Sequence, residues 1–431
     1  MAKNKGRLVD EKWEEIFNDH PIIEEVNKNG CYKITSSEIN NYREARLMTK
    51  FDHRKNLPYI FTENNLTILP ISRGEYIIGN YEVYQDINLV YDNIKPKEFS
   101  FPGWIESINP KNLFSESAAL QGAFVSGILN DLVQKDKLIS TVSGRMSTKT
   151  FDFNIGNKKT NKNNKILVEN SQCEIDGGYE TDDRFILIEA KNSLSQNFLI
   201  RQLYYPYRLW LKKLNKKVTP IFMIYSNDIF SFFVYEFEDP LYYNSLRLIK
   251  QENYIIKEEK TTLNDLKSIY KSVKTKPEPE VPFPQADSFI RVLDLIKALY
   301  EENLNIEDIS TRYDFDIRQA NYYSSAARYL GLVEKVDDKF QLTPEGFDII
   351  DLNVKERNLA LAKSILEHEI FYKVFQLYLK KSGSVSKPEV EKIMLDNINK
   401  IYNVNSESTV RRRAQTVIKW IEWIFNLERN K

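Results

Sequence analysis

Acidic residues and a lysine interrupt a short stretch that otherwise reads as two β-strands. The stretch, residues 174–191, is EIDGGYETDDRFILIEAK. Glu174, Asp176, Glu189 and Lys191 alternate there with Ile, Leu, Phe and Tyr. Burying carboxylates and an ammonium in or beside a sheet is costly unless they pair with each other or hold a cation. The stretch therefore predicts either an ion-pair cluster or a cation site.

A polar turn at residues 181–183 makes the two strands an antiparallel hairpin. This turn predicts that Asp176 lies opposite Ile188, one position from Glu189, on strands about 5 Å apart. Period-two alternation puts Glu189 and Lys191 on the same face. Two carboxylates, one amine and the Ala190 carbonyl then converge. The carboxylate and carbonyl oxygens are hard ligands that suit Mg²⁺. A bound Mg²⁺ can activate a water for attack on a phosphodiester, which the Lys191 ammonium can orient or stabilise.

Aspartate, a spacer and Glu-x-Lys on the next strand resembles the PD-(D/E)XK nuclease superfamily, and within it the type II restriction endonucleases. The motif reads Ile175-Asp176 followed by Glu189-Ala190-Lys191, with Ile175 where proline is usual. The resemblance covers residues 101–240. It implies that an acid from a preceding helix, Glu116, and a glutamine from the following helix, Gln202, support the site.

The resemblance implies a site-specific, Mg²⁺-dependent double-stranded DNA endonuclease of the type II restriction kind. In such an enzyme Asp176 and Glu189 would hold the metal and Lys191 would assist the attacking water. A homodimer is expected, because cutting both strands of a duplex usually needs two active sites. A cognate DNA methyltransferase is expected as a separate protein.

Two other interpretations stay open. Lys191 could instead form a strand-end salt bridge with Glu189 or Glu174, as exposed pairs of this kind are common. The protein would then be a non-catalytic winged-helix DNA-binding regulator. A repair or non-specific nuclease on the same fold is the second alternative.

The chain of 431 residues is long enough for several domains. We predict an N-terminal α+β region over 1–100 and a nuclease core over 101–272. A Pro-rich linker over 273–285 precedes a winged helix-turn-helix over 286–352 and a second helical or winged-helix-like module over 355–431. The expected fold class is an α/β restriction-endonuclease-like core, a mixed sheet flanked by helices, followed by mostly helical winged-helix domains. The basic stretch REARLMTKFDHRKNLP in the N-terminal region is either a solvated face or a DNA-contacting surface.

Two helices in the C-terminal part carry donors that suit DNA. In residues 316–330, Asp316 and Gln319 predict a capping box, and the outer face presents Arg318, Asn321 and Arg328. In the last helix, Val410, Ala414, Val417, Ile421 and Phe425 form the expected core stripe. The opposite face is expected to present Thr409, Arg412, Arg413, Thr416 and Lys419, with the arginines near the helix start as readers of phosphate or guanine.

The composition of the chain indicates its cellular compartment and limits its partners. Formal net charge is zero, so a nucleic-acid partner must be judged segment by segment. Cys31 and Cys173 define no disulfide framework, which favours a reducing compartment. The sequence contains no apolar run of membrane-spanning length, so we expect a cytoplasmic protein without a membrane partner.

Overall fold

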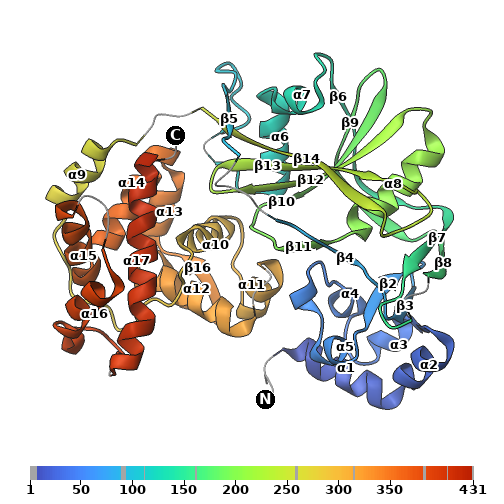
Figure 1. Ribbon diagram of the computed structural model, residues 1–431, viewed down its shortest axis with the longest axis horizontal. Coiled ribbons are helices and arrows are strands. Elements are labelled where there is room, and N and C mark those ends of the chain that lie inside the picture. The colour runs from blue at the N-terminus through green and yellow to red at the C-terminus, as the bar shows by residue number, and fades with distance from the viewer. Residues whose placement is uncertain are drawn as a thin grey trace. The chain divides into compact units, whose positions relative to one another are not determined.

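The computed structural model describes residues 7–88, 94–110, 112–160, 163–257, 261–313, 316–381, 385–404 and 406–429. The chain folds into two compact units (Figure 1). The first, here called the sheet unit, consists of Met1–Lys97, Ala123–Tyr225 and Ile229–Tyr254. The second, the helical unit, consists of Glu98–Gly122, Ser226–Asp228 and Ile255–Lys431. The predicted mixed α/β chain with a helical C-terminal region is confirmed.

A seven-stranded mixed sheet dominates the sheet unit. Its strands are β5 (Lys97–Phe99), β6 (Ile139–Ser147), β9 (Gln172–Glu180), β10 (Arg184–Lys191), β12 (Lys217–Ser226), β13 (Ile229–Phe237) and β14 (Leu246–Ile256). They lie in the order β5-β14-β13-β12-β10-β9-β6. β10 is parallel to β12, and β9 is antiparallel to both β6 and β10. The apolar runs of β10, β12 and β13 are buried along most of their length, as expected for strands covered on both faces.

Helix α8 (Arg201–Lys213) connects β10 to β12, because parallel neighbours need a crossover connection. It buries Leu203, Tyr204 and Leu209. The residues just before this helix form strand β11 (Asn197–Leu199), which pairs with β4 (Tyr84–Asp86). Helices α6 (Glu116–Val125) and α7 (Ile128–Val133) precede β6 in the chain.

The N-terminal region and the large sheet share one hydrophobic core, which includes Trp13 of α1 and Phe222 of β12. Its helices are α1 (Leu8–Asp19), α2 (Ile22–Asn29), α3 (Ser36–Asn40), α4 (Ala45–Met48), η1 (Arg54–Asn56) and α5 (Tyr59–Glu63). Its strands β1 (Tyr32–Thr35), β2 (Thr67–Pro70) and β3 (Glu75–Gly79) form a sheet in the order β1-β3-β2. A separate hairpin pairs β7 (Thr150–Gly156) with β8 (Asn163–Glu169).

The helical unit begins its regular part with α9 (Leu263–Ser272), α10 (Phe289–Glu301), α11 (Ile306–Arg312) and α12 (Ile317–Tyr329). The predicted capping box starts α12, with the Gln319 amide donating to Asp316 Oδ1 at 2.7 Å. An antiparallel hairpin of β15 (Val333–Val336) and β16 (Lys339–Leu342) follows. The remaining helices are α13 (Pro344–Asp351), α14 (Val354–Leu366), α15 (Glu369–Lys380), α16 (Lys387–Leu395), η2 (Ile398–Lys400) and α17 (Glu407–Arg429).

The predicted linker, residues 273–285, lies inside the helical unit and packs against it. Phe283 is 2% exposed and stacks on Phe371 of α15. Lys276 bonds to Glu367 through both its amide and its ammonium. The two predicted C-terminal modules also share one core, which extends from α10 to α17. The proline-rich composition therefore marks an extended packed strap rather than a solvated tether.

Helix α17 has 23 residues, enough to cross a bilayer, but Arg411, Arg412 and Arg413 interrupt its apolar character. No helix in the described ranges is both long enough and apolar enough to span a membrane.

Candidate active site at the end of strands β9 and β10

Asp176 lies where the pairing of β9 with β10 ends. The antiparallel ladder runs from Phe185 opposite Glu180 to Ile188 opposite Gly177. Beyond that pair, the Ala190 amide donates to the Asp176 side chain, at Oδ2, over 2.7 Å. The predicted register, with Asp176 opposite Ile188, is wrong by one residue, because the turn closes with the Thr181 amide bonded to the Arg184 carbonyl. The shift brings Asp176 level with the Glu189-Ala190-Lys191 segment.

Glu189 is the centre of a small hydrogen-bonded cluster. Its Oε1 accepts from Lys191 Nζ at 2.6 Å and from Gln202 Nε2 at 2.6 Å. Lys191 Nζ also donates to the Ala190 carbonyl at 3.0 Å. The side chains of Glu189 and Lys191 are only 9% and 14% exposed. Four of the five predicted catalytic residues, Asp176, Glu189, Lys191 and Gln202, are therefore held together by β9, β10 and the first turn of α8.

The position of this cluster in the sheet is chemically significant. Lys191 pairs with Ile224 at the carboxyl end of the parallel pair β10–β12. In open α/β sheets, ligands bind at the carboxyl ends of the parallel strands. The charged residues of β10 thus lie at the carboxyl end of the strand, where a ligand is expected. The first part of the strand packs in the core.

The electrostatics of Asp176 reflect its partial burial. Burial raises the pKa of its carboxyl group above the usual value. The Lys191 ammonium and the hydrogen bond from the Ala190 amide oppose that rise, and the Glu174 carboxylate adds to it. A cation beside Asp176 would stabilise the ionised form in the same way as Lys191 does.

Glu116, the fifth predicted catalytic residue, begins α6 and is half-buried. It belongs to the helical unit, whereas the other four belong to the sheet unit. Its predicted support of the site remains a prediction.

The other acids of the hairpin do not join the cluster. Glu174 is exposed and pairs with Arg145 at 3.1 Å. Near the turn, Glu180 pairs with Lys216 at 2.8 Å, and Asp182 and Asp183 pair with Lys135 at 3.0 and 3.3 Å. Lysines and arginines neutralise these outer acids, so the carboxylates left for a cation are those of the cluster around Glu189.

The oxygens available for a metal are few. In the ranges that the structure describes, no group of three or more His, Cys, Asp or Glu side chains could hold a metal ion. The cluster offers the carboxylates of Asp176 and Glu189 with the Ala190 carbonyl between them. Gln202 Oε1 is buried and has no hydrogen-bond partner among the described residues. Mg²⁺ uses one or two carboxylates and keeps several waters, so this donor set fits Mg²⁺.

The basic N-terminal stretch is only partly solvated. Arg46 and Lys50 are exposed, whereas His53 is 3% exposed and its Nδ1 lies 2.7 Å from the Asn197 carbonyl oxygen. The Arg54 amide donates to Asn197 Oδ1 at 2.8 Å. Asn197 follows β10 in the chain, so this stretch braces the segment between β10 and α8. The sequence carries no local signal for that long-range contact.

The residues of α12 that were predicted to bind DNA differ in exposure. Arg318 and Asn321 are exposed and Arg328 is half-buried. Arg318 Nε donates to the Tyr322 hydroxyl one turn later, and its guanidinium carbon lies 5.4 Å from the centre of the Tyr322 ring. Asn321 Nδ2 donates to the Ile317 carbonyl at 2.9 Å.

On α17 the predicted outer face is corrected. Arg412 and Lys419 are exposed, and Lys419 pairs with Glu422 at 2.9 Å. Arg413 is only 8% exposed and Thr416 only 1%. Thr416 Oγ1 donates to Asp287 Oδ1 at 2.5 Å. The segment before α10, which contains Asp287, therefore covers Thr416.

Three family models match the chain, and each describes a domain of unknown function. DUF6996 matches residues 10–78, DUF6997 residues 79–255 and DUF7226 residues 291–429, each less than half of the chain. Neither a curated protein nor a solved structure matches it. The DUF6997 match contains the cluster around Glu189, and the DUF7226 match spans both predicted C-terminal modules.

Proposed function

We propose that this chain is a site-specific, Mg²⁺-dependent double-stranded DNA endonuclease of the type II restriction kind. The observation that carries the proposal is the convergence of Asp176, Glu189, Lys191 and Gln202 at the carboxyl end of β10. The proposed fold of the sheet unit is restriction-endonuclease-like. The hairpin β9–β10 followed by α8 and the parallel strand β12 supports it. Three helices and the hairpin β15–β16 support a winged helix-turn-helix over 286–352.

Each residue of the cluster has a role in this proposal. Asp176 and Glu189 would hold Mg²⁺, which when bound polarises the phosphodiester and lowers the pKa of an attacking water. Gln202 fixes the orientation of Glu189 through its 2.6 Å hydrogen bond. The Lys191 ammonium would orient the water or stabilise the negative charge that develops on the phosphate. A homodimer and a separate cognate methyltransferase belong to the same proposal.

A non-catalytic DNA-binding regulator is the second candidate. The 2.6 Å contact between Lys191 and Glu189 favours it, because a largely buried ion pair can serve structure alone. Under this proposal the helical unit binds DNA and the acids of the hairpin are dispensable for function.

Plasmid cleavage distinguishes these candidates. The wild-type protein, Asp176→Ala, Lys191→Ala and the control Lys217→Ala are incubated with plasmid DNA in Mg²⁺, and their DNA binding is measured by gel shift in Ca²⁺. Lys217 is an exposed lysine at the start of β12, paired with Glu236 away from the cluster. We expect discrete fragments from the wild type and the control. Asp176→Ala and Lys191→Ala are expected to bind DNA without cutting it.

The other outcomes are equally informative. A smear of fragments would indicate a non-specific nuclease on the same fold. Uncut plasmid with a normal gel shift for all four proteins would favour the regulator. Full cleavage by Asp176→Ala or Lys191→Ala would refute the assignment of the active site.

A further inference from the structure

Arg413 is a buried cation without a counter-ion in the described part of the chain. It lies in the second turn of α17 and is 8% exposed. Its Nε is fully buried and has no hydrogen-bond partner. Within the described ranges the side chain forms no hydrogen bond or ion pair.

The groups around Arg413 do not supply the missing negative charge. Burial lowers the pKa of Arg413 to about 10, the Tyr322 hydroxyl opposes that change, and the Arg412 guanidinium adds to it. Asp287 lies on the covering segment, but its Oδ1 accepts from Thr416 one turn along α17. The two groups that act on the charge of Arg413 are therefore a phenol and a second cation.

Two other buried arginines of the chain have polar partners. Arg357 is 0% exposed and its NH2 lies 2.7 Å from Asp228 Oδ2. Arg208 is 4% exposed and donates to the Asp152 carbonyl and to the Tyr204 hydroxyl. An uncompensated buried guanidinium is costly, whereas a paired one is tolerated. The contrast indicates that the partner of Arg413 comes from outside the chain.

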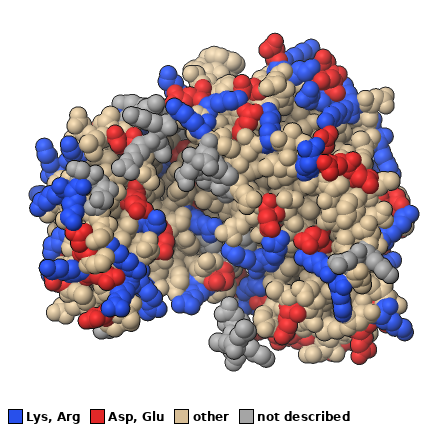
Figure 2. Space-filling view, viewed as in Figure 1, with Lys and Arg blue, Asp and Glu red and all other residues tan. Residues whose placement is uncertain are grey.

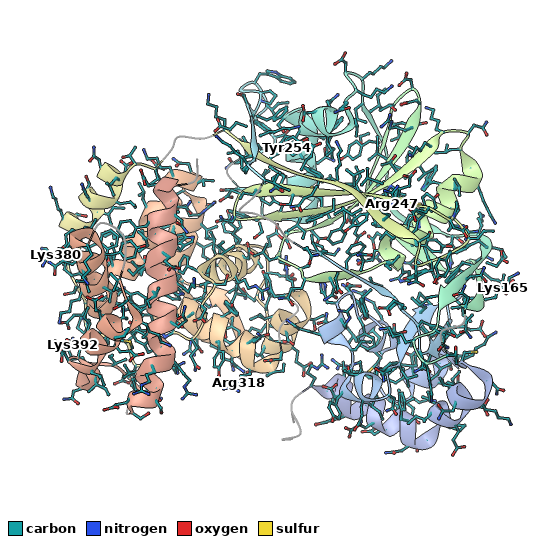
Figure 3. The ribbon with its side chains drawn as sticks, in the orientation of Figure 1. Lys165, Arg247, Tyr254, Arg318, Lys380 and Lys392 are labelled. Carbon is teal, nitrogen blue, oxygen red and sulfur yellow. The ribbon has the colours of Figure 1, made fainter. Side chains whose placement is uncertain are left out.

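The surroundings of Arg413 suit a phosphate. The Tyr322 hydroxyl of α12 acts electrostatically on Arg413 and also accepts a hydrogen bond from Arg318 Nε. Figure 3 shows Arg318 at the lower edge of the helical unit, and α17 begins on the same side (Figure 1). Figure 2 shows Lys and Arg side chains, with Asp and Glu side chains among them, on this lower side of the unit. Guanidinium groups match phosphate oxygens in geometry, and a tyrosine hydroxyl can add a further donor.

We propose that Arg413 anchors one backbone phosphate of a bound nucleic acid, with Arg412, Arg318 and Tyr322 around it. The site unites residues from both predicted C-terminal modules, which makes the helical unit a single nucleic-acid-binding surface. Duplex DNA as the partner rests on the proposed function. The buried anchor itself rests only on the contacts of Arg413.

The test uses the full chain and two arginines of the same helix. Arg413→Met removes the buried charge but keeps much of the packing volume. The matched control is Arg411→Met, because Arg411 is exposed and two residues away on α17. Binding of a labelled random-sequence duplex is measured by fluorescence anisotropy in Ca²⁺ at several salt concentrations. Thermal unfolding without DNA is measured for the same proteins.

We expect Arg413→Met to weaken duplex binding about tenfold and to lower the salt slope by about one unit. Without DNA, the same variant is expected to melt at a higher temperature than the wild type, because an unpaired buried charge is removed. Arg411→Met should change affinity several-fold less and leave the melting temperature near that of the wild type. Arg318→Gln, an exposed change, should reproduce the loss of binding without altering stability.

Several results would overturn the proposal. Wild-type affinity and salt slope in Arg413→Met would do so, and would leave the endonuclease proposal intact if plasmid is still cut. If duplex binding depends on Arg413 but the plasmid is not cut, the endonuclease proposal is refuted. The proposal that Arg413 binds a phosphate is then retained. If inorganic phosphate, but not duplex, raises the melting temperature of the wild type and not that of Arg413→Met, the site holds a free anion and the nucleic-acid assignment is wrong. Absence of any duplex or phosphate effect refutes the anchor outright.

Discussion

Lys191 Nζ lies 2.6 Å from Glu189 Oε1, and the two residues are two positions apart on β10. Both side chains point to one face of the strand, and both are mostly withdrawn from water. Gln202 donates to the same oxygen of Glu189 from α8. Glu189 therefore links the strand that carries the lysine to the helix that follows it.

Replacing Glu189 by glutamine should destabilise the protein. The change leaves the Lys191 ammonium without its closest counter-charge, and removing one partner of a buried ion pair costs about 3 kcal/mol or more. The free energy of unfolding, measured by urea denaturation, should fall accordingly. The control Glu174→Gln breaks an exposed pair with Arg145 and should change stability little. Equal stability of Glu189→Gln and wild type would show that the pair is effectively solvated.

Mg²⁺ should stabilise the wild type through Asp176. A ligand that binds only the folded state raises its stability, so the melting temperature should rise with Mg²⁺ concentration. Asp176→Asn should abolish this rise. Because burial raises the pKa of Asp176, ionising this carboxyl group is less favourable in the folded than in the unfolded state, and the variant should melt slightly higher than wild type without metal. Asp182→Asn, in the exposed turn of the same hairpin, should keep the Mg²⁺ response. A response retained in Asp176→Asn would place the metal elsewhere.

Asp294 of α10 should make stability depend on pH. Burial raises the pKa of its carboxyl group to about 7, against the opposing Lys297 and the hydrogen bond from Ser226. The folded state then binds one more proton than the unfolded state between the two pKa values. Its contribution to stability is complete at acidic pH and is lost as the pH rises toward about 7, by at most about 1.4 kcal/mol per unit.

The difference in unfolding free energy between wild type and Asp294→Asn isolates this effect, because other groups cancel. The difference should shift in favour of Asp294→Asn from pH 5 to pH 7 and level off above it. A difference independent of pH would contradict the raised pKa. The fully buried neighbour Arg357 should be left unchanged in this experiment, since its pair with Asp228 supports the same region.

A fragment that ends at residue 285 should not fold as the full chain does. Phe114, Leu266 and Phe283 are at most 5% exposed, and they belong to the core that α10 to α17 complete. Cutting before α10 would expose these side chains, so the fragment should aggregate or bind the dye ANS strongly. A fragment that starts at residue 261 keeps most of that core and serves as the comparison. A soluble, cooperatively unfolding 1–285 fragment would contradict this expectation.

Much of the local structure could be predicted from the sequence, because each signal lies within a few neighbouring residues. The apolar runs of β12 and β13 are typical of strands covered on both faces, and Asp316 with Gln319 indicated the start of α12. The turn at Thr181 placed Glu189 and Lys191 beside Asp176 to within one residue. The nuclease chemistry of this group remains a prediction, although the structure does bring the four residues together.

The tertiary structure decided what depends on distant segments. The pattern of α17 defined one apolar stripe, Val410 to Phe425, and left Arg413 and Thr416 on the opposite face. In the folded chain α17 contacts α9, α10, α14, α15 and α16, so little of its circumference is left for water. The proline-rich strap also packs against neighbouring helices. Its composition indicates how the isolated segment behaves, but not which surface of the folded chain is available to cover it. A sequence specifies which faces are apolar, but only the packed neighbours determine which polar groups are withdrawn from water without a partner.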